Sequence, residues 1–280
     1  MIVSGGQMSS RTLTTLIVGG NNIGDQGLQY LIDMLQENKT LITLDVISIS
    51  ISNEGVCYLA SALQKNETLI TLDLGLNNIG PVGAKHFASV LQNNRTLTTL
   101  GLSSNLIDSQ GAQSLANALK RNKTLTTLNL EHNEIDDEGI EYLANALEEN
   151  KTLTTLNIGS NDFRDDGVIH VASILAQNKT LIALDLQTNK IGPEGACYLA
   201  TALKKNKTLT TLNIQSNDIR TSGAQHIASL LQENEALVTL DLANTRIGSQ
   251  GVVYLFNALE ENKVTFFLHF VILSSRDYFT

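Results

Sequence analysis

Apolar residues recur along this chain in one fixed order, with a period of 28 residues. Within a single period, residues 125–130 have the alternating leucine spacing of a short strand that buries one face. Residues 140–147 then place apolar side chains at intervals of three and four residues, as on one face of a helix. A unit this small cannot bury those side chains alone. It must stack against neighbouring units of the same kind.

The unit occurs nine times without an insertion. A glycine before each helix and an asparagine after it keep the same interval as the leucine that opens each strand. That leucine stands at Leu13, Leu41, Leu69, Leu97, Leu125, Leu153, Leu181, Leu209 and Leu237. The regularity predicts an α/β solenoid of 28-residue repeats, formed as one elongated array with no internal linker.

The repeat divides the chain into three parts. Residues 1–11 form a polar lead-in, residues 12–262 form the nine repeats, and residues 263–280 form a degenerate C-terminal strand that seals the core, followed by a tail. The lead-in offers no recognisable cap, although solenoids normally need a polar terminal unit. We therefore expect that the chain is a fragment of something longer or that a partner covers the first unit, for instance by end-to-end self-association there.

Polar residues at three fixed positions are expected to satisfy backbone groups. The asparagine that ends each helix is expected to adopt a left-handed conformation. The turn asparagines after the strands are expected to stack in a ladder that forms hydrogen bonds with the units above and below. Two units lack this asparagine and carry Ile49 and Thr245 instead. We therefore expect looser local structure at residues 47–52. The helix starts should cap their own opening turns through Asp25, Asn53, Ser109, Asp137, Asp165, Thr221 and Ser249.

The composition narrows the range of partners and locations. A net charge of −9 argues against nucleic acid or an anionic membrane as partner, because both need clustered Lys and Arg. No apolar run approaches the roughly 20 residues that cross a bilayer, and the opening residues lack a secretion signal, so we expect a cytoplasmic protein. Cys57 and Cys197 lie five units apart, on the order of 24 Å, which is too far for a disulfide.

The pattern LxxLxLxxNxIxxxGxxxLAxALxxN, present as LTTLNLEHNEIDDEGIEYLANALEEN, resembles the ribonuclease-inhibitor-like class of leucine-rich repeats. The run NKTLTTLNL with GxxxLAxAL is more similar to the repeats of NOD-like receptors, and the resemblance covers about residues 12–262. It implies a curved horseshoe with parallel strands on the concave face and helices on the convex face. It also implies protein recognition, either as partner sensing or as autoinhibition of a neighbouring domain.

Other members of the same repeat class keep alternatives open. Ran GTPase-activating proteins and bacterial effectors delivered into host cells carry similar repeats, so a GTPase regulator or an effector domain is the alternative interpretation. The chain has no GxxxxGK[ST] nucleotide-binding loop. It also has no HxxxH pair, Cys/His cluster or nucleophile with a base. We therefore predict no catalytic residue, no metal and no cofactor.

The concave surface can be read from the alternation along each strand. Residues that flank the buried middle leucine point away from the core, and they form a threonine column beside an Asp/Asn column, with no Lys or Arg. Such residues also simply suit exposed strands, but their charge predicts a platform for a basic protein or peptide. The predicted contact residues are Ile17, Asp45, Ile47, Asp73, Leu76, Asn129, Glu131, His132, Asn157, Asp185, Gln187, Asn213, Gln215 and Asp241.

Overall fold

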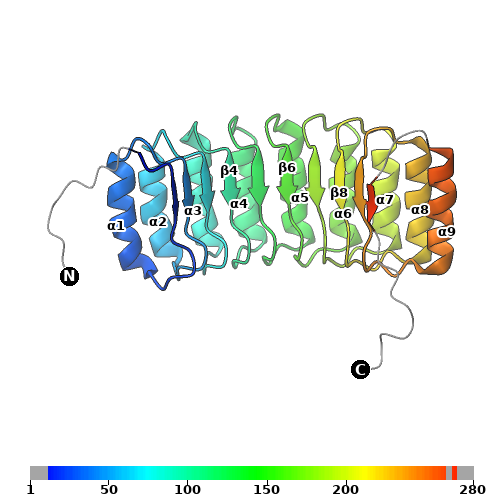
Figure 1. Cartoon of the computed structure of the whole chain (residues 1–280), viewed down its shortest axis with the longest axis horizontal. Helices are drawn as coiled ribbons and strands as arrows, with labels where there is room; N and C mark the ends of the chain where they lie inside the picture. The colour runs from blue at the N-terminus through cyan, green and yellow to red at the C-terminus, as the bar shows by residue number, and fades with distance from the viewer. Residues whose placement is uncertain (1–11, 263–266, 270–280) are drawn as a thin grey trace, which may run out of the picture.

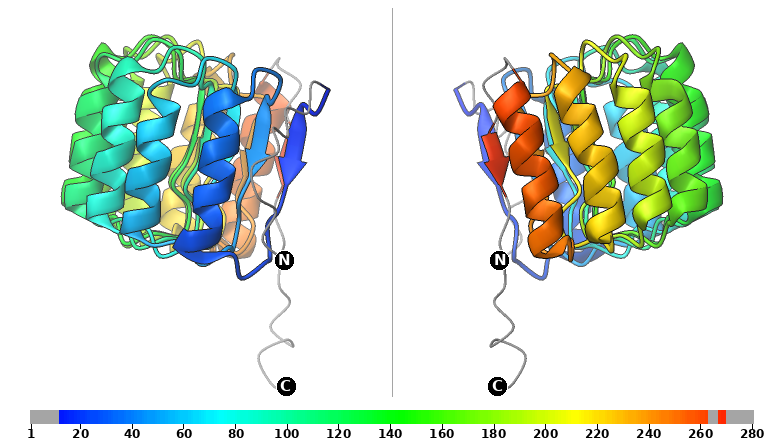
Figure 2. Two further views of the ribbon diagram at one scale, coloured as in Figure 1. Left: turned by 90° about the vertical axis from the view of Figure 1, so that its left-hand side faces the viewer. Right: turned by 90° about the vertical axis from the view of Figure 1, so that its right-hand side faces the viewer.

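The computed structural model describes residues 12–262 and 267–269. The lead-in expected at residues 1–11 and most of the segment expected at 263–280 lie outside the described residues. In the described part, strands and helices alternate along the chain. All ten strands form one parallel sheet in sequence order, and Figures 1 and 2 show the helices stacked side by side over one face of that sheet, which curves away from them.

The strands are three residues long: β1 (Thr15–Ile17), β2 (Thr43–Asp45), β3 (Thr71–Asp73), β4 (Thr99–Gly101), β5 (Thr127–Asn129), β6 (Thr155–Asn157), β7 (Ala183–Asp185), β8 (Thr211–Asn213), β9 (Thr239–Asp241) and β10 (Phe267–His269). The helices are α1 (Gly24–Glu37), α2 (Asn53–Leu63), α3 (Pro81–Asn93), α4 (Ser109–Leu119), α5 (Asp137–Glu149), α6 (Asp165–Leu175), α7 (Pro193–Leu203), α8 (Arg220–Glu233) and α9 (Gly248–Glu261).

The core is a continuous leucine layer between the sheet and the helices. Each strand pairs in register with the next unit, so that Leu100 lies opposite Leu128 and Leu128 opposite Leu156. These strand leucines are buried, and so are the apolar residues on the inner face of each helix. The fold is therefore an α/β leucine-rich-repeat solenoid. β10 continues the sheet, with Leu268 opposite Leu240.

The turn asparagines form the predicted ladder between units. The Asn77 Nδ2 atom donates to the carbonyl oxygens of Leu74 and Gly75 in its own unit and of Val46 in the unit before, each at 3.0 Å. Its Oδ1 accepts the N–H groups of Ile49 and Ile51 at 3.2 Å. The backbone of unit two is therefore bonded by the asparagine of unit three, although unit two has Ile49 in place of its own turn asparagine. The looser structure expected around residues 47–52 stays a prediction.

None of the asparagines that end the helices has a positive φ, so the predicted left-handed conformation is wrong. Asn150 has φ −71° and ψ 132°. In this conformation its Nδ2 donates to the Leu119 carbonyl of the preceding unit at 2.7 Å, and its Oδ1 accepts from Thr152 and Leu153. The equivalent residues of the first eight units, from Asn38 to Asn234, are 1–7 % exposed. In the units after the first, the backbone places this side chain where it bonds the preceding unit, so these asparagines form a second ladder.

The helix-start residues bond mainly to the following unit, which corrects the prediction that they cap their own helices. Asp136 caps α5 by accepting the N–H groups of Glu138 and Gly139. Asp137, already inside the helix, instead accepts the N–H groups of Arg164 and Gly167 at 2.6 and 2.9 Å, at the start of α6. A residue in the first helical turn points sideways, so its carboxylate reaches the neighbouring helix.

The repeated glycine makes room for this contact between units. A Cβ atom on Gly83 would lie 2.7 Å from the Asn53 Oδ1 and 2.7 Å from the Ile79 Cγ2. Asn53 Oδ1 accepts the Gly83 N–H at 2.9 Å, and Gly83 has a negative φ. Close packing between units, not backbone freedom, therefore explains this glycine.

Asn77→Ala should lower the free energy of unfolding by about 1–3 kcal/mol, because it leaves buried backbone groups in two units without partners. Asn78→Ala is the matched control, since Asn78 is the next residue and its side chain is exposed. Urea unfolding followed by circular dichroism measures both. Equal losses in the two variants would contradict the ladder.

Asp137→Ala and Asp136→Ala should destabilise different helices. Loss of a cap costs about 1 kcal/mol, so Asp137→Ala should speed amide exchange at the start of α6, and Asp136→Ala at the start of α5. Hydrogen–deuterium exchange by mass spectrometry resolves the two helices. Faster exchange confined to α5 in both variants would show that Asp137 caps its own helix.

Candidate functional site

The open face of the sheet carries the side chains that flank each buried leucine. In β3, Leu72 is buried, whereas Thr71 and Asp73 are partly exposed on the opposite side. The same alternation holds from β2 to β9, except that Gly101 has no side chain to expose. The predicted contact residues on this face are Ile17, Asp45, Asp73, Asn129, Asn157, Asp185, Asn213 and Asp241 at the strand ends, Ile47, Glu131, Gln187 and Gln215 two residues further on, and Leu76 and His132 in the turns.

Six of these residues form a hydrogen-bonded network over units five to eight. Glu131 accepts hydrogen bonds from Asn157 Nδ2 at 3.1 Å and from Gln187 Nε2 at 2.6 Å. Gln187 in turn accepts from Gln215 Nε2 at 3.0 Å, and Asp185 accepts from Asn213 Nδ2 at 2.9 Å.

The bond between Glu131 and Gln187 crosses a whole unit. Gly159 stands between the two residues, and a Cβ atom there would lie 2.7 Å from the Gln187 Cγ. The missing side chain therefore lets Gln187 lean across. Strand alternation predicts the side of the sheet but not this reach.

Two aspartates near the N-terminal end have no such side-chain donors. Asp45 accepts the Ile47 N–H and Asp73 accepts the Gly75 N–H, each at 3.0 Å. Asp185 is bonded by Asn213, the residue at the same repeat position in the following unit. For Asp73, the residue at that position in the following unit is Gly101, which has no side-chain amide. The Asp73 carboxylate lies directly against that glycine, 2.4 Å from where a Cβ would stand.

Two of the concave carboxylates, Asp73 and Asp185, have a pKa raised above the ordinary value. Partial burial raises the pKa of Asp73, and the charge of Asp45 adds to the effect, while the N–H groups of Gly75 and Leu74 oppose it. Burial likewise raises the pKa of Asp185. The negative charges of Glu131 and Asp241 raise it further, while the hydrogen bonds from Gln187 and Asn213 lower it. A nearby cation would stabilise the ionised form of both carboxyl groups.

Ion pairs of the described residues lie outside the concave face. Several are on the helices, such as Lys120 with Glu149 and Lys204 with Glu233. Others lie at the turns, where Arg220 and Arg246 both pair with Asp218 and lower its pKa.

This turn cluster was not predicted as a site. Arg246 borders a shallow hollow of about 520 Å³ together with Lys190, Asp218 and neighbouring turn residues. The signal in the sequence was the basic residue that units six to nine carry near their turns, at Arg164, Lys190, Arg220 and Arg246.

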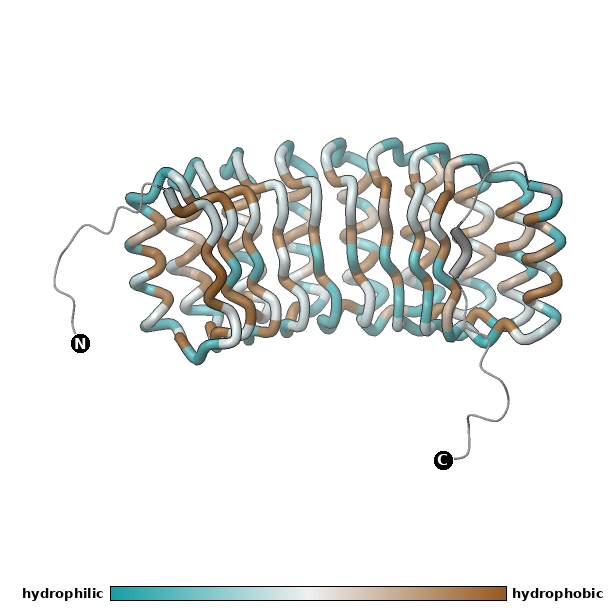
Figure 3. Tube along the Cα trace, in the orientation of Figure 1, coloured by the Kyte–Doolittle hydropathy of each residue, from teal (hydrophilic) through white to brown (hydrophobic). Residues whose placement is uncertain are grey.

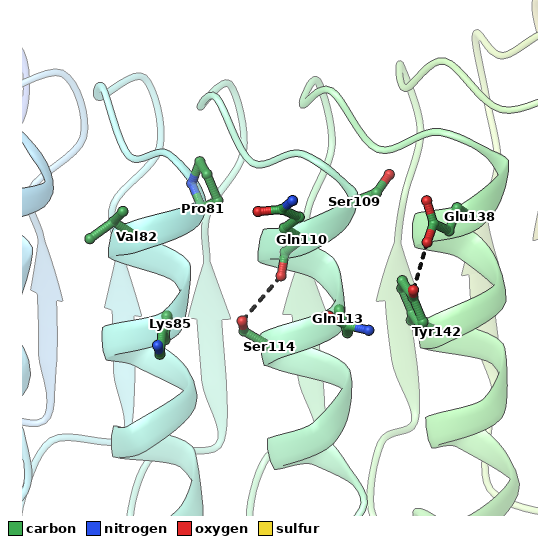
Figure 4. Close-up of a pocket in the computed structure, with 9 residues that line it drawn as sticks. All are labelled: Pro81, Val82, Lys85, Ser109, Gln110, Gln113, Ser114, Glu138 and Tyr142. Atoms are coloured by element: carbon green, nitrogen blue, oxygen red, sulfur yellow. Dashed lines mark hydrogen bonds between the residues drawn. The ribbon is translucent and has the colours of Figure 1, made fainter.

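The helical face has a hollow of about 490 Å³ across the first turns of α3, α4 and α5 (Figure 4). The hydrogen bonds between its lining residues run within single helices, from Ser114 Oγ to the Gln110 carbonyl and from Tyr142 to Glu138. The described residues include no group of three or more His, Cys, Asp or Glu side chains that could hold a metal ion. No helix in that part of the chain has the length and apolar character needed to cross a membrane.

Comparison with known proteins agrees with this geometry. A family model described as Leucine Rich repeat matches residues 9–31, 65–88, 93–116, 121–144, 149–172, 177–200, 205–228 and 233–256, more than half of the chain. The second unit, which lacks the turn asparagine, falls between the first two matches. No curated protein sequence gives a significant match. A solved structure titled "Leiomodin-1 Actin-Binding Site 2 (ABS2)" is similar over 45% of this chain and 73% of that chain, with 26% identity and a TM-score of 0.41.

Asp73→Asn and Asp218→Asn should change stability at neutral pH in opposite directions. The folded state raises the pKa of Asp73 above its ordinary value of about 4, so stability falls as pH rises through that window. The folded state lowers the pKa of Asp218, so its stabilisation is complete above about pH 4 and is lost as pH falls.

Asp73→Asn should therefore raise the urea midpoint at pH 7 and Asp218→Asn should lower it modestly, because Asp218 is near the surface. Both differences should shrink as the pH falls below about 4, because protonation removes the charge of each carboxyl. Shifts of the same sign at pH 7 would contradict the assignment.

Proposed function

The chain belongs to the leucine-rich repeat family, and we propose that it is a non-catalytic scaffold whose concave face binds a basic protein or peptide. Leucine-rich repeat proteins generally serve as scaffolds for protein interaction. The observation that carries the proposal is the row of concave carboxylates without basic neighbours. Asp45, Asp73, Glu131 and Asp185 take part in none of the ion pairs of the described residues. A partner with Lys or Arg would supply the missing charge.

The shape of the surface favours a macromolecule over a small ligand. Small-molecule sites are enclosed and mostly apolar, whereas this face is an open sheet on which most exposed side chains are polar. An extended peptide or a protein surface can contact several units at once. The acidic character also disfavours nucleic acid and anionic membranes, whose phosphates would be repelled.

The finer assignment follows the repeat pattern. We infer a ribonuclease-inhibitor-like class with repeats of the NOD-like receptor type, in which the array senses a partner or restrains a neighbouring domain; the register of 28 residues and the GxxxLAxAL pattern support it.

We also infer a cytoplasmic location. The free thiols of Cys57 and Cys197 support it, and so do the Asn-x-Thr asparagines, whose amides are buried in hydrogen bonds and not open to glycosylation. End-to-end self-association belongs to the same proposal, since Leu13 and Tyr30 are exposed on the first unit.

Binding of short fluorescent peptides tests the function. A Lys/Ser peptide should bind and a Glu/Ser peptide should not. The double variant Glu131→Gln, Asp185→Asn should weaken Lys/Ser binding about tenfold, because it removes two partly buried charges from the surface. Fluorescence anisotropy at low and physiological salt gives both affinities.

The matched control removes two charges from helix ends. Glu37→Gln, Glu148→Gln has the same net charge as the concave double variant, but both glutamates are exposed in the last turns of α1 and α5. Equal weakening by the two double variants would show general charge attraction and would contradict binding at the concave face.

A further inference from the structure

Exposed apolar side chains on the concave face gather at its N-terminal end. Ile17 is 68% exposed and Leu76 is 59% exposed, with Ile47 half-buried between their units. In later units the position of Ile17 holds Gly, Asn or Asp, and the position of Leu76 holds Ser, His, Thr or Asn. Figure 3 shows the hydrophobic colouring concentrated along the strands at this end. Stability of the solenoid gains little from these exposed side chains.

Leu76 also has an unfavourable backbone. Its φ is 53°, in the left-handed region that bulky side chains rarely adopt. The same position has a positive φ in the other units, which place Gly, Ser, His, Thr or Asn there. The turn therefore accounts for the backbone conformation but not for a large, exposed apolar side chain at this position.

Charge complementarity identifies what this apolar surface would contact. Asp45 and Asp73 lie on adjacent paired strands, about 5 Å apart, and each accepts only backbone N–H groups. Gly101 has no side-chain amide that could donate to Asp73. The Asp73 carboxylate therefore keeps an oxygen available for a partner's donor, whereas Asn213 donates to Asp185. Two such carboxylates match the forked guanidinium group of an arginine.

We propose that Ile17, Asp45, Ile47, Asp73 and Leu76 form an anchor surface for a segment of the partner protein in which an apolar residue adjoins an arginine. The inference rests on the proposed function and names the place where that partner is held. The guanidinium group lies between the two carboxylates. The aliphatic part of the arginine and the neighbouring apolar residue cover Ile47 and Leu76.

Two variants separate this anchor surface from general attraction without altering net charge. Leu76→Ser restores a residue that other units carry at the turn. Gly101→Asn places a Cβ 2.4 Å from the present position of the Asp73 carboxylate, so it should displace that carboxylate and offer it a side-chain amide, as Asn213 does for Asp185. Both changes follow the repeat pattern, and circular dichroism and urea unfolding check that each variant folds.

The probes are labelled peptides containing Leu-Arg, Ser-Arg or Leu-citrulline in an otherwise identical Ser/Gly sequence, because citrulline keeps the shape of arginine without its charge. The wild-type protein should bind the Leu-Arg peptide about tenfold more tightly than either of the others. Leu76→Ser should remove the preference for Leu over Ser. Gly101→Asn should reduce the preference for arginine over citrulline.

Leu106→Ser is the matched control, since Leu106 is 48% exposed but lies outside the anchor surface, and it should leave binding unchanged. If Leu76→Ser and Gly101→Asn have no effect while Glu131→Gln, Asp185→Asn still weakens binding of the Lys/Ser peptide, the anchor surface is wrong and the proposed function stands. If no basic peptide binds, both proposals fail. A wild-type dimer that Leu76→Ser converts to monomer would show that a second copy occupies the surface, which also overturns the anchor proposal.

Discussion

Every unit of this solenoid depends on its neighbours for both its hydrogen bonds and its buried surface. Asn77 bonds the backbone of units two and three, Asn150 bonds units four and five, and Asp137 caps the helix of unit six. An unpaired buried polar group costs about 1–3 kcal/mol, so a separated unit would lose several such contributions along with its apolar contacts. The constant length of 28 residues keeps each of these contacts in register.

This dependence leaves the open face of the sheet free to vary. The leucine layer and the two asparagine ladders use the side chains that point inward or along the stack. Side chains on the concave face take no part in them, so their chemistry can differ from one end to the other. Central units satisfy one another through Glu131 and Gln187, whereas the N-terminal units leave apolar and acidic groups open to a partner.

The sequence was sufficient to predict the architecture, because the period alone determines which leucines meet and which face of each strand is open. It did not predict how far polar side chains reach. Asp137 was expected to cap its own helix, but its position in the first turn directs the carboxylate to the next unit. Asn150 was expected to be left-handed, but bonding to Leu119 favours an extended backbone. Both errors came from considering one unit at a time.

The candidate surface shows the same limit. Strand alternation placed Asp73 and Asp185 on one face, yet their neighbours, Gly101 and Asn213, make them chemically different.

Deletion of one whole unit, residues 124–151, compared with deletion of half a unit, residues 124–137, tests the dependence on stacking most directly. If units are stabilised by equivalent contacts with their neighbours, the whole-unit deletion should still give one cooperative urea transition at a slightly lower midpoint, and the half-unit deletion should lose far more stability. Equal loss of stability in the two proteins would contradict this account.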